Sequence, residues 1–172
     1  MKWSTSRLVQ PAHVASVDGS LNMRLESKEG HVFEMRIVGY QFPHLETADY
    51  DSNWLFIAGE VVHPKGTWQF SDPCLLTYEV ARLASWIDSI AERQPLSTTC
   101  DFIEPNLEFR VLPGDHPVLG VYFELEARPA WASRQAADGE LWVEFPLNDL
   151  DLRLIARELR SALSAYPQRA PK

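Results

Sequence analysis

The chain has 172 residues, of which 45% are hydrophobic and 11% aromatic, and its formal net charge is −8. This length predicts a single domain that spans residues 1–172 and buries about 70% of the surface its unfolded chain exposes, and the composition excludes a disordered chain. The negative charge argues against binding to nucleic acid or to an anionic membrane, because both repel it, and favours a basic partner.

The two ends of the chain carry no regular pattern. We expect residues 1–18 to form an extended arm and residues 167–172 a frayed tail. No apolar h-region follows the first residues, and no apolar run approaches the ~20 residues that span a bilayer, so we expect a cytoplasmic protein. Cys74 and Cys100 lack the C-x-x-C spacing of redox and metal sites, so we expect both thiols to be reduced and buried.

Four strands are predicted in the first half of the chain, at residues 21–26, 33–38, 54–62 and 67–70. Apolar and polar residues alternate in the first two, and Glu29-Gly30 marks the turn of a hairpin between them. The third is apolar on both faces, which is typical of a central strand. The segment His63-Pro64-Lys65-Gly66 connects it to the fourth in a second hairpin.

A helix is predicted near residues 73–93. Its apolar positions recur at steps of four and three and therefore share one face: Leu76, Val80, Leu83, Ile87 and Ile90. Ser71 or Asp72 can cap this helix, and Pro73 suits the first helical position. Gln94-Pro95 ends the helix.

The second half repeats this order of elements. Strands are predicted at 107–111, 118–127 and 141–145, with a longer loop at 129–139. A second helix is predicted near 149–165, where Asn148 is a candidate cap and Asp151 supplies an acidic first turn. Its apolar stripe comprises Leu152, Ile155, Leu159, Ala162 and Leu163.

Runs of strands punctuated by single helices predict an α+β fold: a mainly antiparallel sheet of about seven to eight strands with two helices on one face. The order strand-strand-strand-helix occurs twice. Two explanations remain open, an internal duplication and the periodicity of strands alone.

The sequence carries no recognised catalytic or metal motif. Asp49 to Asn53 and Glu60 copy the spacing of an EF-hand loop, but Trp54 replaces the glycine it needs, and an extended strand carries Glu60 away at about 3.3 Å per residue. The five histidines include no i, i+4 pair, and no P-loop, G-x-S-x-G or G-x-G-x-x-G occurs. A helix N-terminus near Cys74 could lower its pKa, yet a small buried thiol is the preferred interpretation. We therefore expect no enzyme, no cofactor and no metal.

Aromatic and acidic residues gather around the connection between the second and third strands. Its counterpart in the second half shortens to residues 113–117. Aromatic anchors ringed by charge are typical of protein interfaces, although these rings can also belong to the core or its rim. The predicted partner-binding residues are Tyr40, Phe42, Glu46, Asp49, Tyr50, Asp51 and Trp54.

Four segments between residues 32 and 90 resemble a family of small bacterial cytoplasmic proteins. They are Gly39-Tyr40-Gln41-Phe42-Pro43, Asp51-Ser52-Asn53-Trp54-Leu55, Gly66-Thr67-Trp68 and Asp72-Pro73-Cys74-Leu75-Leu76-Thr77-Tyr78-Glu79. This family is the WapI-like immunity proteins, which neutralise a cell-wall-associated toxin of the producing cell. The resemblance implies a non-catalytic binding protein and supplies no site residues.

Three hypotheses for the function follow, and the oligomeric state stays open in each. The first is an immunity-type protein that neutralises a basic toxin domain by occlusion. The second is a homo-oligomeric structural or regulatory module, paired through sheet edges or through outward-facing Tyr122 and Trp142. The third is an enzyme of unrecognised type, which a pocket containing two or more titratable groups with perturbed pKa would favour.

Overall fold

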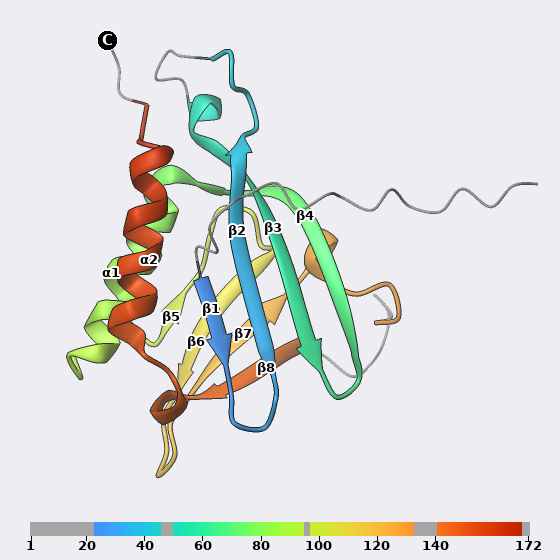
Figure 1. Cartoon of the computed structure of the whole chain (residues 1–172), viewed down its shortest axis with the longest axis vertical. Coiled ribbons are helices and arrows are strands. Elements are labelled where there is room, and N and C mark those ends of the chain that lie inside the picture. Colours follow the sequence, from blue (N-terminus) through green and yellow to red (C-terminus); the bar gives the residue numbers. More distant parts are fainter. Residues whose placement is uncertain (1–22, 46–49, 95–96, 133–140, 170–172) are drawn as a thin grey trace, which may run out of the picture.

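The computed structural model describes residues 23–45, 50–94, 97–132 and 141–169. This part contains eight strands and two α-helices, and all strand pairs are antiparallel, which confirms the predicted α+β class (Figure 1). The strands are β1 (Met23–Glu26), β2 (Val32–Tyr40), β3 (Trp54–His63), β4 (Gly66–Leu76), β5 (Thr99–Cys100), β6 (Leu107–Leu112), β7 (Val118–Phe123) and β8 (Leu141–Pro146). The helices are α1 (Thr77–Ala91) and α2 (Leu152–Ala165), with 3₁₀ turns η1 (Tyr50–Asn53), η2 (Leu125–Ala127) and η3 (Leu147–Asp149). The arm predicted for residues 1–18 lies outside the described residues.

The strands form two sheets of four, where we expected one sheet. Sheet A has the order β1-β2-β3-β4 and sheet B the order β5-β6-β7-β8. Their apolar faces pack against each other: the ring of Phe123 in sheet B lies edge-on to Phe33 and Trp68 of sheet A, with centroids 5.4 and 5.3 Å apart. Each sheet thereby buries the alternating apolar positions of the other, a task that the prediction had assigned to the helices.

The two helices lie side by side at one side of the sheets, as Figure 1 shows. An ion pair between Arg160 and Asp88 links them. The predicted stripe of α1 is buried in full, and Ile155, Leu159 and Ala162 of the α2 stripe are buried with it. These side chains belong to the same core as the inner faces of the sheets.

The start of α1 differs from the prediction. Ser71, Asp72 and Pro73 belong to β4, and α1 begins at Thr77, where the carboxylate of Glu79 accepts a hydrogen bond from the backbone N–H of Leu76 at 2.9 Å. Because β4 is an edge strand with a bulge between its pairs with Leu55 and Phe56, it tolerates a proline that has no N–H to donate.

Cys74 is the extra residue of that bulge, so it does not lie at a helix N-terminus. Its thiol and that of Cys100 are both free and buried, as expected. Burial raises the pKa of the Cys74 thiol far above its ordinary value and that of Cys100 to about 11. Both groups are therefore held as neutral thiols.

Two element boundaries in the second half also differ from the prediction. Asp151, rather than Asn148, caps α2, because its side chain accepts a hydrogen bond from the backbone N–H of Leu154 at 3.0 Å. Asn148 lies in η3. Strand β7 ends at Phe123, and the predicted continuation to Ala127 instead forms η2, in which Leu125 has a φ of 48°.

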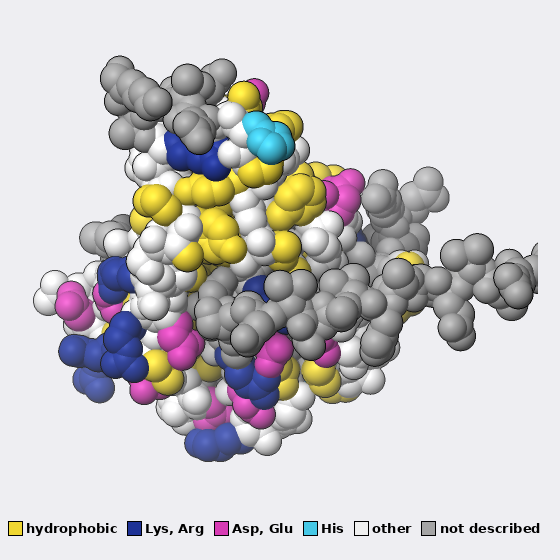
Figure 2. Space-filling model, turned by 45° about the horizontal axis from the view of Figure 1, so that its top comes forward, with side chains coloured by type: hydrophobic (Ala, Val, Ile, Leu, Met, Phe, Trp, Pro, Cys, Tyr) yellow, Lys and Arg dark blue, Asp and Glu magenta, His cyan; other side chains and the backbone are white. Residues whose placement is uncertain are grey.

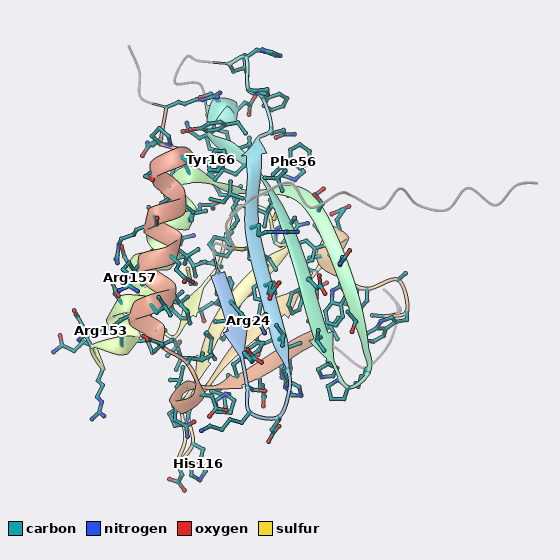
Figure 3. All side chains as sticks on the ribbon, in the orientation of Figure 1. Arg24, Phe56, His116, Arg153, Arg157 and Tyr166 are labelled. Atoms are coloured by element: carbon teal, nitrogen blue, oxygen red, sulfur yellow. The ribbon has the colours of Figure 1, made fainter. Side chains whose placement is uncertain are left out.

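The two halves share one plan, which makes an internal duplication plausible. Each consists of four antiparallel strands in sequential order followed by a helix, and β5 supplies the fourth strand that the sequence pattern did not reveal. The long connection between β2 and β3 corresponds to residues 113–117 between β6 and β7. This shorter turn carries His116 at the opposite end of the molecule from Tyr166 and Phe56 (Figure 3).

Candidate functional site

The long connection begins where β2 ends, and the start of β3 holds it in place. The N–H of Gln41 donates to the carbonyl of Trp54 at 2.8 Å, and Leu45 N–H donates to Phe42 O at 3.1 Å. Asn53, which is buried, accepts at Oδ1 from the hydroxyl of Thr77 at 3.0 Å. The described part of the connection is therefore tied to the end of sheet A and to the start of α1.

The predicted partner-binding residues divide into exposed and buried members. Phe42 is 39% exposed and Tyr50 is 50% exposed, and Asp51 is also exposed. Trp54 is only 8% exposed and lies edge-on to Tyr50, with centroids 6.0 Å apart. Trp54 therefore packs against the exposed ring of Tyr50, in agreement with the interpretation that some of these aromatics belong to the rim of the core.

Of the remaining three predicted residues, the structure describes only Tyr40. Tyr40 is half-buried, and its ring lies between Tyr166 and Arg169. Glu46 and Asp49 lie outside the described residues. We therefore place the described site on Phe42, Tyr50 and Asp51, with the buried Trp54 packed against Tyr50.

Beside these residues lies an open groove of about 450 Å³. Its wall is formed by the start of β3, the end of β4, the loop before β6, and η2. The lining residues are Gln41, Phe42, Asp51, Trp54, Asp72, Pro73, Glu104 and Glu126. Four of these carry carboxylates, and the described residues that line the groove include no lysine or arginine. We call this feature the acidic groove.

The carboxylates of the acidic groove repel one another. Burial raises the pKa of Asp72, and the charges of Glu126 and Glu104 raise it further. The side-chain amide of Asn106 opposes this shift by donating to Asp72 and to Glu126, each at 3.4 Å. The groove thus concentrates negative charge that a cation from outside would stabilise.

Hydrophobic side chains gather at the same end of the molecule. Figure 2 shows them over the upper part of the visible face, with a few charged side chains among them, whereas most of the charged side chains lie over the lower part. Tyr78, which is 36% exposed, lies against Tyr50, and its pKa is raised to about 12 by burial and by that neighbour. With Phe42, these two tyrosines form an exposed set of rings that we call the aromatic rim.

Sequence reasoning missed Asp72, Glu104 and Glu126. The position of Asp72 could have been predicted, because the hairpin at Lys65-Gly66, when continued in register, pairs residue 72 with Ile57. Because Pro73 was interpreted as the start of a helix, the predicted strand ended at residue 70, whereas β4 continues to Leu76. No local signal indicates that Glu104 and Glu126 meet this strand, since only the packing of sheet B against sheet A brings them there.

Asp72→Asn is expected to raise the free energy of unfolding at pH 7 by about 0.5 kcal/mol, a size usual for a partly exposed charge interaction. Because the folded pKa of Asp72 is raised above its ordinary value of 3.8, ionisation destabilises the folded chain. This penalty is complete above the folded pKa and vanishes as the pH falls below 3.8. Urea unfolding of both proteins from pH 7 to pH 3 measures it, and a variant less stable than the parent at pH 7 would contradict the expectation.

The described residues contain no helix with the length and apolar character needed to cross a bilayer, and no group of three or more ligand side chains placed to hold a metal ion. His31 and His63 come together, with ring centroids 5.2 Å apart, at the turns that end β1 and β3. They lie outside the acidic groove.

The protein is of the α+β class, with two sheets packed face to face and two adjacent helices. At one end it carries the acidic groove beside exposed aromatic rings. The model of the Immunity protein WapI-like family matches residues 24–167, and the chain therefore belongs to this family. The match confirms the resemblance of the first half and extends through the second. Membership implies a protein partner such as a toxin, and the family is in general non-catalytic. Neither the curated proteins nor the solved structures include a significant match.

Proposed function

We propose that this protein neutralises a cognate toxin domain by binding it and covering its working surface, with the acidic groove and the aromatic rim as the contact. The observation that carries the proposal is the placement of four carboxylates beside exposed rings, with no lysine or arginine among the described lining residues, in a chain that belongs to an immunity family. The toxin surface that fits this contact is basic and contains lysine or arginine.

The chemistry of the contact supports a protein partner. Exposed aromatic side chains with a buried partner beneath them are typical of the residues that dominate binding energy at protein interfaces. Tyr50 meets this description, since its ring packs against that of the buried Trp54, and Phe42 lines the same groove. The carboxylates steer a basic partner toward the rings and accelerate the encounter.

The alternative of a homo-oligomer through the outward face of sheet B receives less support. Tyr122, which we expected to be available there, is 6% exposed. Arg110 covers its ring at 3.9 Å, and Trp142 packs against it with centroids 5.2 Å apart. Trp142 itself is 39% exposed, so light scattering over a range of concentrations is a useful check on self-association.

The test uses the toxin domain encoded beside this protein, with binding kinetics measured at several salt concentrations. Asp51→Lys is expected to reduce the association rate at least tenfold and to flatten its salt dependence, because it reverses a charge in the groove. Glu92→Lys is the matched control, since it makes the same change in net charge at an exposed position that does not line the groove. Figure 1 shows the end of α1 at the lower left, away from the connection between β2 and β3.

Phe42→Ala in the same assay is expected to weaken binding at least tenfold, mainly through faster dissociation. Asp72→Asn is expected to weaken binding while raising stability, a combination that indicates a functional surface. Failure of the unaltered protein to bind the toxin domain or to protect cells from it would refute the proposed function. Equal effects of Asp51→Lys and Glu92→Lys would refute the assignment of the contact to the groove.

A further inference from the structure

The end of the described chain contacts the connection that carries the binding surface. Arg169 lies after α2, yet its guanidinium donates hydrogen bonds to carbonyls of the 41–45 segment. Nη1 donates to the carbonyl of Phe42 at 2.8 Å and to that of Leu45, and Nη2 donates to the carbonyl of Pro43 at 3.2 Å. One side chain therefore holds three backbone carbonyls of a single turn.

Further contacts fix the position of this arginine. Its backbone N–H donates to Asn53 Oδ1 at 2.9 Å, the same atom that accepts from Thr77. The guanidinium carbon lies 3.7 Å from the centroid of the Tyr40 ring, and the hydroxyl of Tyr40 donates to the carbonyl of Pro167. Pro167 and Arg169, within the segment we expected to be frayed, thus have defined partners.

The three side-chain hydrogen bonds of Arg169 lie at the surface, whereas its backbone N–H bonds to the buried Asn53. The last buried residue of α2 is Ala162, seven positions earlier, whereas Arg169 is half-buried. Phe42 and Leu45 are 39% and 38% exposed. Losing these contacts would therefore free the connection while leaving the two sheets and their interface intact.

We propose that Arg169 is a positioning residue, which holds the 41–45 segment so that Phe42 is presented at the edge of the acidic groove before the partner arrives. The inference rests on the proposed function, since it concerns the same surface. A preformed binding segment avoids the loss of conformational entropy that ordering it during binding would require. When only a fraction of molecules is ordered, the apparent Kd rises by the inverse of that fraction.

Arginine suits this role better than lysine does. Its planar guanidinium offers five donors in a rigid fork, so it can serve three carbonyls while stacking on a tyrosine ring. A lysine ammonium is a compact charge that stacks poorly and reaches fewer of these acceptors. Arg169→Lys is therefore expected to behave more like Arg169→Ala than like the unaltered protein.

The first measurement is amide hydrogen exchange of the free protein. Arg169→Ala is expected to accelerate exchange at Gln41 and Leu45 at least tenfold and to leave Ile57 in the centre of sheet A unchanged. Arg157→Ala is the matched control, because Arg157 is an exposed arginine on α2 that points away from the connection (Figure 3). Unchanged exchange at Gln41 and Leu45 in Arg169→Ala would overturn the inference.

The second measurement is binding to the toxin domain. Arg169→Ala is expected to raise Kd about tenfold through slower association, with Arg157→Ala unchanged. The double variant with Phe42→Ala is expected to bind no more weakly than Phe42→Ala alone, because Arg169 acts through Phe42. Faster exchange with an unchanged Kd, or additive effects in the double variant, would overturn the positioning role. If the unaltered protein does not bind the toxin domain, the proposed function fails, and the exchange measurement still decides whether Arg169 orders the segment.

Discussion

Phe123→Ala is expected to lower the free energy of unfolding by about 4 kcal/mol, the usual result of truncating a fully buried phenylalanine. Phe123 ends β7 with no exposed surface, and its ring meets three aromatic rings of sheet A. Its ring centroid lies 5.4 Å from that of Phe33, 5.3 Å from that of Trp68 and 6.3 Å from that of Phe70. Removing it leaves a cavity between the sheets and breaks three favourable ring contacts at once.

Urea unfolding followed by circular dichroism measures this loss. Phe42→Ala is the matched control, because it removes the same atoms from a ring that is 39% exposed. We expect the control to change the free energy of unfolding by less than about 1 kcal/mol, as surface substitutions generally do. A loss below about 1.5 kcal/mol for Phe123→Ala would contradict face-to-face packing of the two sheets. The pair also separates stability from binding, since only Phe42 belongs to the proposed contact.

Glu79→Ala is expected to lower the free energy of unfolding by about 3 kcal/mol at neutral pH, because two hydrogen bonds to a charged group disappear. Glu79 lies in the first turn of α1 and is only 1% exposed. Its Oε2 accepts from the N–H of Leu76 and its Oε1 from the N–H of Ile103, both at 2.9 Å. One carboxylate thus caps the start of α1 and ties it to the loop that precedes β6.

The expected loss is again measured by urea unfolding. Glu92→Ala is the control, since Glu92 is exposed at the other end of the same helix, and it should change stability by less than about 0.5 kcal/mol. Glu79→Gln should lie between the two, because its amide keeps one acceptor oxygen for one of the two N–H groups. Equal stability of Glu79→Ala and Glu92→Ala would mean that the hydrogen bonds of Glu79 to Leu76 and Ile103 contribute nothing to the free energy of unfolding.

The local patterns of the chain were read correctly where one periodicity dominates. The alternation of Phe33, Met35 and Ile37 and the apolar stripe of α1 are buried as predicted, because both elements have a single apolar face that only one placement can cover. The start of α1 was missed because Pro73 suits both the first turn of a helix and an edge strand, and only the bulge beside Leu55 and Phe56 decides between them.

The residues of the candidate site could also be predicted only in part from the sequence. Phe42, Tyr50 and Asp51 could be selected from sequence because they are close together in an unusually long connection. Glu104 and Glu126 could not be, since they lie more than 50 residues further along the chain and enter the groove only when sheet B packs on sheet A. Arg169 was also missed, because its partners are backbone carbonyls, which no side-chain pattern encodes.

By itself, the sequence determined the antiparallel α+β class, the two helical stripes and the family, because all three depend on residues that are neighbours along the chain. The tertiary structure alone decided that the strands divide into two sheets, that four carboxylates share one groove, and that Arg169 reaches the 41–45 segment. The physical reason is that these features arise from contacts between distant segments, whose geometry is set by the burial of both apolar sheet faces in one core.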